Sequence, residues 1–170
     1  MDALVPVDAT TTVAWHAAAS AADDALARHA AAVLGVDASS VRVGRLCPRC
    51  GSDAHGRPWV SGGVDVSLSR SHGLLVTAVS TGGPVGVDVE SVDDVDAGWD
   101  RALVLHADER ADTPDERARM WCRKEAILKA AGTGLDVPMP DILAACHDVT
   151  DLAAPEGFRA AVSVLRSEDG

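Results

Sequence analysis

Alternating apolar and polar positions predict a run of short strands in the middle of the chain. Val64–Ser69 alternates strictly, as a strand with one buried face does, and Leu74–Ser80 follows through a turn at Ser71–Gly73. Val85–Glu90 is predicted as a further strand. Thr81–Pro84 is the clearest turn signal in the chain. We therefore expect two halves, residues 1–83 and 84–170, that meet at this turn.

Two long segments have helical composition. Residues 14–34 are rich in alanine and are followed by Gly35, a residue typical of helix C-termini. Thr113 precedes Pro114 and Glu116 in the pattern of an N-cap with a capping box. The helix that begins there should continue to about Ala131.

The remaining segments predict shorter elements. Val41–Val43 is expected as a strand, and Cys47–Pro58 as a loop rich in turns. Ile142–Val149 and Phe158–Leu165 are expected as closing strands. These segments complete a mixed pattern of helices and strands.

Charge and composition narrow the class of protein. The net charge of −11 argues against nucleic acid as the main partner. No apolar run is long enough to cross a bilayer and no secretion signal is recognisable, so we expect a cytoplasmic protein. The predicted helix after Thr113 is locally basic and is a candidate surface for an acidic partner or a phosphorylated ligand. Its basic residues are Arg117, Arg119, Arg123, Lys124 and Lys129.

The four cysteines do not suggest a disulfide framework in a cytoplasmic chain. Cys47 and Cys50 have the spacing of half a zinc knuckle, with His55 as a possible third ligand and His72 as a distant fourth. No second Cys-x-x-Cys pair follows, so a plain turn with two reduced thiols is favoured over zinc.

Three carboxylates and one ammonium are placed to form a site. Asp88 and Glu90 share one face of their predicted strand. Trp121, Glu125 and Lys129 are spaced four apart and share one stripe of the helix. If the helix packs across the strand, the carboxylates converge and would suit Mg²⁺. The structural alternative is a helix-surface ion pair between Glu125 and Lys129, with Asp88 capping the end of a strand.

Two of these segments, Gly86–Glu90 and Trp121–Gly134, resemble the signature motifs of the 4′-phosphopantetheinyl transferases. Gly56–Pro58 and Val66–Ser71 resemble the upstream motifs of the same family. The position of Gly86–Glu90 in mid-chain is similar to the two-half class of the family. The resemblance implies an α+β fold of two pseudo-symmetric halves. Each half would be a small antiparallel sheet packed on a helix, with the active site in the cleft between them.

The resemblance also implies an activity. The family transfers the phosphopantetheine arm of coenzyme A to a serine of an acyl, peptidyl or aryl carrier protein and releases adenosine 3′,5′-bisphosphate. By motif, Asp88, Glu90 and Glu125 would bind Mg²⁺, and Lys129 would contact phosphate. Glu125, or a water that it holds, would take the serine proton. Arg57 and Ser69 would contact the phosphates of coenzyme A.

Two departures from the family pattern affect the coenzyme site. The histidine that often follows the upstream serine is replaced by Arg70, which can bind a phosphate bidentately, while His72 is expected in a turn. Before Arg42, the chain offers Arg28 as its only Lys or Arg, with His16 and His29 nearby. The resemblance therefore leaves the contacts of the coenzyme's 3′-phosphate open.

We expect a monomeric transferase that serves fatty-acid, polyketide or nonribosomal-peptide carriers. One alternative is a family member that has lost activity and binds carrier protein. The other is a small zinc-knuckle interaction protein built on Cys47, Cys50 and His55.

Overall fold

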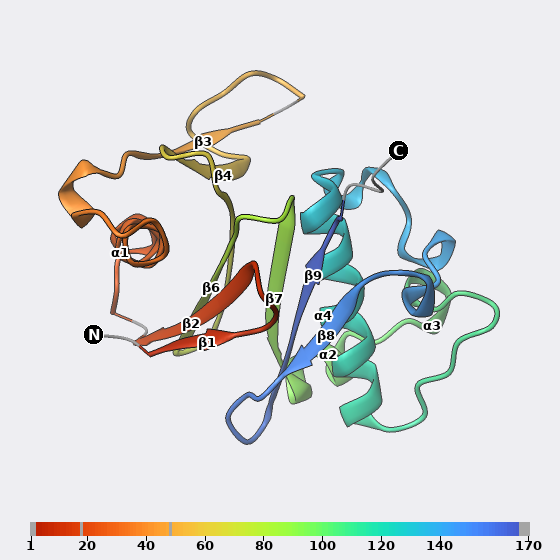
Figure 1. The fold of residues 1–170 in the computed structure, drawn as a ribbon. Helices are drawn as coiled ribbons and strands as arrows, with labels where there is room; N and C mark the ends of the chain where they lie inside the picture. The colour runs from red at the N-terminus through yellow and green to blue at the C-terminus, as the bar shows by residue number, and fades with distance from the viewer. Residues whose placement is uncertain (1–2, 18, 48, 167–170) are drawn as a thin grey trace.

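The computed structural model describes residues 3–17, 19–47 and 49–166. The N-terminal half is an antiparallel sheet in the order β1-β2-β6-β5. Its strands are Leu4–Pro6 (β1), Thr11–Ala17 (β2), Asp65–Ser71 (β5) and Leu74–Ser80 (β6). Helix α1, Ala22–Leu34, covers one face and buries Leu26 and Ala30 against Val66 and Val79 (Figure 1). The helix ends at Gly35, whose φ of 68° is the left-handed conformation expected of a C-cap.

A two-stranded ribbon stands apart from this sheet at the top of Figure 1. It pairs Val43–Leu46 (β3) with Arg57–Val60 (β4), and the loop between them carries the two cysteines of the predicted turn. Pro48 of that turn lies outside the described residues. A short 3₁₀ segment, Ala38–Ser40 (η1), connects α1 to the ribbon.

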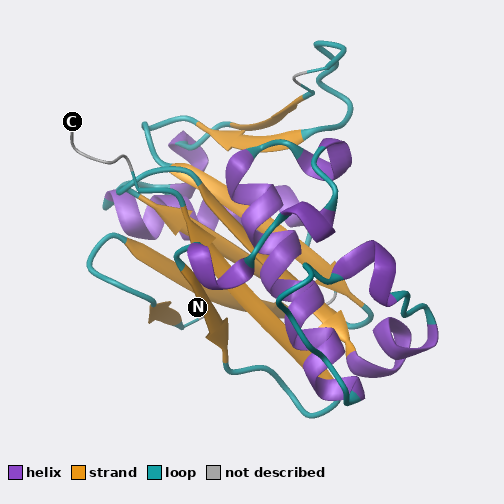
Figure 2. Cartoon of the chain, turned by 90° about the vertical axis from the view of Figure 1, so that its right-hand side faces the viewer, coloured by secondary structure: helices purple, strands orange, loops and turns teal. Residues whose placement is uncertain are grey.

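The C-terminal half is an antiparallel sheet in the order β7-β9-β8 covered by one long helix. Its strands are Val85–Ser91 (β7), Val149–Leu152 (β8) and Phe158–Val164 (β9). Helix α4, Pro114–Ala131, lies across β7 and β9, and Figure 2 shows the strands running behind the helices. The shorter elements are α2 (Val92–Ala97), α3 (Arg101–Val104), η2 (Gly134–Asp136), η3 (Met139–Asp141) and η4 (Ala144–Cys146).

The two halves share one core and meet along β5 and β7. Val76 of the first sheet packs in the same cluster as Val87 and Val162 of the second. The Ser67 hydroxyl accepts a hydrogen bond from the backbone N–H of Val87 at 3.1 Å. The fold is therefore α+β, with each half an antiparallel sheet on a helix.

Two element boundaries differ from the sequence prediction. Residues 14–17 of the predicted helix are the end of strand β2, which is paired on both sides by β1 and β6. Alanine has the highest helix propensity, but propensity contributes only about 0–0.7 kcal/mol per residue, and pairing within a sheet overrides it. The predicted strand Val41–Val43 instead spans Val43–Leu46.

Ile142–Val149 is not a strand as predicted: it is a loop with a 3₁₀ turn, and β8 begins only at Val149. Its apolar side chains Ile142 and Ala144 are buried beside Ile127 and Leu128 of α4. An apolar run that packs beneath a helix has the same composition as a buried strand, so the pattern could not separate them. The other predicted elements, helix Pro114–Ala131 among them, are present.

Candidate functional site

Strand β7 holds the two predicted carboxylates on one face. Asp88 is 1% exposed, and one of its oxygens, Oδ1, accepts from the Ser69 hydroxyl at 2.8 Å and from the Lys129 ammonium at 2.6 Å. Glu90 is half-buried and accepts from the Ser71 hydroxyl at 3.4 Å. Alternate serines of β5 therefore support alternate carboxylates of β7 across the boundary between the halves.

Helix α4 brings Glu125 and Lys129 against this strand. The helix begins at the predicted capping box, in which Thr113 and Glu116 each satisfy the other's backbone N–H. Gly86 permits the close approach of strand to helix, because a Cβ atom there would lie 2.0 Å from the Ala126 carbonyl oxygen. The helix-across-strand packing assumed from the sequence is thus present.

The electrostatics show that the three carboxylates lie near one another. Burial, followed by the charge of Asp88, raises the pKa of Glu90 to about 7, although Lys129 opposes the shift. Burial and the charge of Asp88 also raise the pKa of Glu125. The charge of Lys129 lowers the pKa of both Glu90 and Glu125, but burial and the charge of Asp88 outweigh it.

The donor set fits a hard divalent cation. The second oxygen of Asp88, Oδ2, is buried and receives no hydrogen bond from the described residues. The oxygens of Asp88, Glu90 and Glu125 do not all lie within 4.8 Å of one another. Oxygens bound directly to one Mg²⁺ lie at most about 4.2 Å apart, so the three carboxylates as they stand fit the ion only if one of them binds it through a water, which Mg²⁺ commonly keeps.

The neighbouring thiol takes no part in this set. Cys122 of α4 is fully buried and donates to the Arg159 carbonyl at 3.1 Å. Burial, with the nearby charges of Asp88 and Glu90, raises the pKa of this thiol far above its usual range. The thiol therefore stays protonated at neutral pH.

A cleft of about 620 Å³ lies along the boundary of the halves between Lys129 and the β3–β4 ribbon, and the three carboxylates do not line it. Four cationic side chains line it: Arg45, Arg49, Arg57 and Lys129. The Nη2 atom of Arg57 is buried and makes no hydrogen bond to any described residue, although it forms an ion pair with the partly exposed Asp65 at 3.6 Å. Guanidinium groups bind phosphate oxygens well, so the cleft can receive a phosphorylated ligand.

Three residues expected to bind the coenzyme, Ser69, Arg70 and Arg28, are not among those that line this cleft. Arg70 is exposed and donates to the Ser20 carbonyl at 2.9 Å. Arg28 lines a separate cavity of about 260 Å³ together with His16 and His29. His72 occupies the turn between β5 and β6, as expected, and contacts Asp94 at 2.5 Å. Arg70 and Arg28 are therefore placed away from the cleft that contains Arg57.

Sequence reasoning missed Arg45 and Arg49, which line the cleft beside Arg57. Their signal was their position, because both flank Cys47 in the loop that leads into the Gly56–Pro58 motif. Arg45 pairs with Asp23 at 2.7 Å, and Arg49 pairs with Asp136. Both ion pairs are solvent-exposed at least in part, so they can yield to a ligand at low cost.

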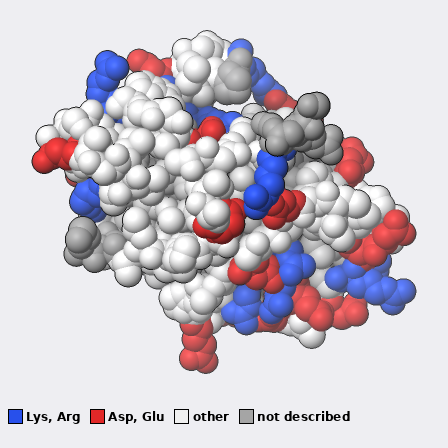
Figure 3. All heavy atoms as spheres, viewed as in Figure 1, with Lys and Arg blue, Asp and Glu red and all other residues white. Residues whose placement is uncertain are grey.

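The locally basic surface expected on α4 is neutralised within the chain. Each of its five basic side chains pairs with a carboxylate, and Figure 3 shows acidic and basic side chains interleaved at the lower right of the molecule. That this face of α4 receives an acidic partner or a phosphorylated ligand stays a prediction, since a ligand would have to displace these carboxylates.

Lys124 is the clearest case of such pairing. It is fully buried, and its ammonium contacts Glu109 at 2.5 Å and donates to the carbonyls of Val104, Met139 and Ile142. The two lysines of the chain thus differ in role, since Lys124 anchors the helix and Lys129 faces the carboxylates.

No helix of the described residues is long and apolar enough to cross a membrane. Residues 84–159 match the family model described as the 4′-phosphopantetheinyl transferase superfamily. No curated protein is significantly similar to the chain. The matched region contains Asp88, Glu90, Glu125 and Lys129, and it ends before the last residues of β9.

Proposed function

Since residues 84–159 form a domain of the 4′-phosphopantetheinyl transferase superfamily, we propose that the chain transfers the phosphopantetheine arm of coenzyme A to a carrier protein. The acceptor is a serine hydroxyl of an acyl, peptidyl or aryl carrier protein, which changes from the apo to the holo form. The observation that carries the proposal is the carboxylate cluster around Lys129, whose ammonium pairs with Asp88 and which lines a cleft that three arginines also line. The reaction needs such a cluster because charge accumulates on phosphate oxygens in the transition state.

The residues of the cluster and the cleft have different roles in the proposed reaction. Asp88, Glu90 and Glu125 would hold Mg²⁺, which when bound supplies positive charge to the phosphates of the coenzyme. Lys129 lies 2.6 Å from Asp88 and lines the cleft, so its ammonium can contact a phosphate oxygen. Arg57 orients the coenzyme through its phosphates, because its buried Nη2 still has a hydrogen bond to donate.

Glu125 is the group that takes the proton. The serine oxygen forms a bond to the β-phosphorus of coenzyme A, and the bond from that phosphorus to the oxygen of adenosine 3′,5′-bisphosphate breaks. The serine proton passes to Glu125 or to a water beside it. Glu125 is the candidate for this role because its carboxylate lies on α4 against the strand that carries Asp88 and one turn before Lys129.

Ser69 acts through Asp88 rather than on the coenzyme. Its hydroxyl is buried and donates to Asp88 at 2.8 Å, so it holds that carboxylate in place. This assignment replaces the phosphate contact that the motif implied. Cationic contacts to the 3′-phosphate come from Arg45 and Arg49, which line the cleft, in place of Arg28 and Arg70.

The proposal extends to a cytoplasmic monomer, with fatty-acid, polyketide or nonribosomal-peptide carriers as acceptors. The second candidate, an inactive member that only binds carrier protein, lacks support from the site. All four motif residues, Asp88, Glu90, Glu125 and Lys129, are present and adjacent.

The test is intact mass spectrometry of apo carrier proteins incubated with the chain, coenzyme A and Mg²⁺. We expect a mass gain of one phosphopantetheine arm that EDTA prevents. Glu125→Gln should abolish the gain, because it removes a charge at constant size. The matched control is Glu156→Gln, an exposed position outside the cluster that should keep full activity.

The outcomes separate the candidates. A mass gain that survives Glu125→Gln would refute the site, although not the reaction. No gain on any carrier class, with carrier protein still bound at high coenzyme A, would establish the inactive binding module instead. Circular dichroism of the variants checks that each is folded.

A further inference from the structure

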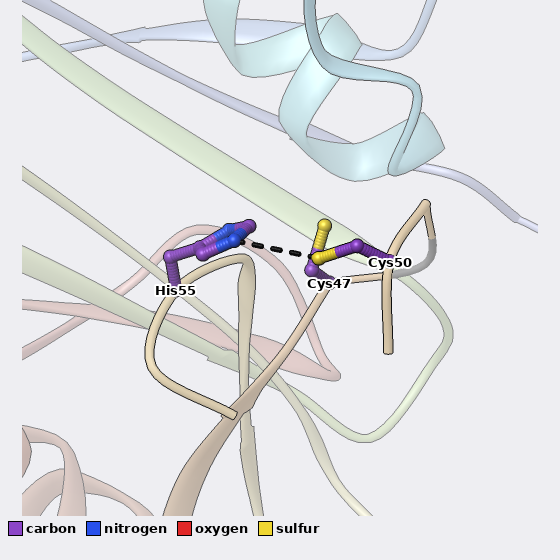
Figure 4. A group of neighbouring side chains, drawn as sticks. All are labelled: Cys47, Cys50 and His55. Atoms are coloured by element: carbon purple, nitrogen blue, oxygen red, sulfur yellow. Dashed lines mark hydrogen bonds between the residues drawn. The ribbon is translucent and has the colours of Figure 1, made fainter. Parts of the chain in front are cut away.

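Cys47, Cys50 and His55 converge in the loop between β3 and β4. Their ligand atoms all lie within 4.8 Å of one another, and Figure 4 shows the three side chains turned toward one point. The Cys50 sulfur is 3.5 Å from Nε2 of His55. Cys47 is half-buried, whereas Cys50 and His55 are exposed, and neither cysteine is in a disulfide. None of the three belongs to the carboxylate cluster.

The backbone of the loop forms a tight turn between the two cysteines. Gly51 has a φ of 72°, and its N–H donates to the Cys47 carbonyl at 2.8 Å. This turn returns Cys50 toward Cys47, so that both sulfurs lie beside the His55 imidazole.

Gly56 brings His55 back to this turn. Its φ is 105°, and a Cβ atom there would lie 2.4 Å from the Leu46 carbonyl oxygen and 2.5 Å from the Cys47 nitrogen. Only glycine allows so close a crossing of the two ends of the loop. The crossing places the imidazole beside both sulfurs, a proximity that the spacing along the chain did not require.

We propose that Cys47, Cys50 and His55 bind a single Zn²⁺ ion. Two thiolates and one imidazole are the ligands that zinc prefers, and they would not retain Mg²⁺. Water completes the four ligands of the ion. His72, considered earlier as a distant fourth ligand, is instead held by Asp94.

The site has a consequence for the cleft. Cys47 and His55 line it, and so do Arg49 and Arg57, which lie within or directly after the same loop. A zinc ion that ties Cys47 to His55 fixes the loop and with it the two guanidinium groups. The zinc therefore acts as a positioning element for a wall of the cleft, and it is independent of the Mg²⁺ cluster.

The test measures zinc per chain in the purified full-length protein after reconstitution with ZnSO₄ and removal of free metal. We expect one zinc per chain in the parent protein and in Cys146→Ser, which changes an exposed free cysteine outside the cluster. Cys50→Ser and His55→Ala should each bind zinc at least tenfold more weakly. Co²⁺ in place of zinc should give the visible bands of a tetrahedral thiolate site in the parent protein and in Cys146→Ser, but not in Cys50→Ser or His55→Ala.

The proposal is overturned if the parent protein retains no zinc. If the protein is isolated with a Cys47–Cys50 disulfide, it is first reduced, and failure of the reduced protein to take up zinc also overturns the proposal. Equal zinc in His55→Ala and the parent would also overturn it, because the histidine is what completes the site. These readouts require no carrier protein or coenzyme, so their failure would leave the transferase proposal untouched. The loop lies outside the hydrophobic clusters, and circular dichroism should show all variants folded.

Discussion

Replacing Lys124 with alanine should destabilise the protein more than any other change on helix α4. The ammonium is 0% exposed and sits 2.5 Å from Glu109, with three backbone carbonyls as further acceptors. Removal leaves Glu109 as a buried carboxylate without its cation, and breaking a buried pair in this way costs about 3–5 kcal/mol. Since domains are stable by only about 5–15 kcal/mol, this is a large share of the total.

The assay is urea unfolding followed by circular dichroism, together with a thermal melt. A loss of about 4 kcal/mol corresponds to a fall in Tm of roughly 8–16 °C for a chain of this size. The matched control is the adjacent Arg123→Ala, which removes two hydrogen bonds of 2.7 Å to Asp151 from a partly exposed ion pair. That change should cost about 1 kcal/mol or less.

Equal losses for Lys124→Ala and Arg123→Ala would refute the reasoning, because the Lys124 pair is buried and holds three further carbonyls, whereas the Arg123 pair is partly exposed. The double variant Lys124→Met with Glu109→Gln supplies a second check. It removes both charges, so it should recover part of the stability that Lys124→Met alone loses. No recovery would mean that packing, rather than the uncompensated carboxylate, sets the cost.

Three further predictions concern the strand–helix contact, the buried histidine and the support of the carboxylates. Gly86→Ala should weaken both stability and transfer, since its Cβ would meet the Ala126 carbonyl; a melt and a transfer assay measure this, and unchanged values would contradict it. Burial lowers the pKa of His29 to about 4, below its value of 6.5 in the unfolded chain. As the pH falls, the unfolded chain therefore binds the proton before the folded chain does. The free energy of unfolding should decrease by about 3 kcal/mol between pH 6.5 and pH 4. Urea unfolding of His29→Gln should show a flatter dependence on pH across that window. Ser69→Ala should weaken Mg²⁺ binding severalfold by freeing Asp88, and calorimetry that finds equal affinity would count against the positioning role.

The sequence could predict which carboxylates of the candidate site share a strand or helix face. It could not predict which neighbouring side chains are buried or paired. Period-two alternation places Asp88 and Glu90 on one face of a strand, and four-residue spacing places Glu125 with Lys129 on a helix. These are local rules that need no knowledge of the fold. These rules place Lys129 on the same stripe as Glu125, but they could not predict that Lys124 is buried. The burial of Lys124 depends on carbonyls 15 to 20 residues away in the sequence.

The same limit explains the predictions that differ. Residues 14–17 have the composition of a helix but pair with β6, and Ile142 has the composition of a strand but packs beneath α4. Arg28 is a basic residue before Arg42, yet it lines a cavity away from Arg57. In each case a distant segment decided the outcome.

The sequence by itself determined the elements whose signals are local: the capping box at Thr113, the Gly35 helix end, the alternating strands and the motif carboxylates. Only the tertiary structure decided which charges are consumed by ion pairs and which face the cleft. It also decided that Gly56 folds His55 onto the two cysteines. The physical reason is that short-range geometry follows from neighbouring residues, whereas burial and charge pairing depend on contacts between segments far apart in the chain.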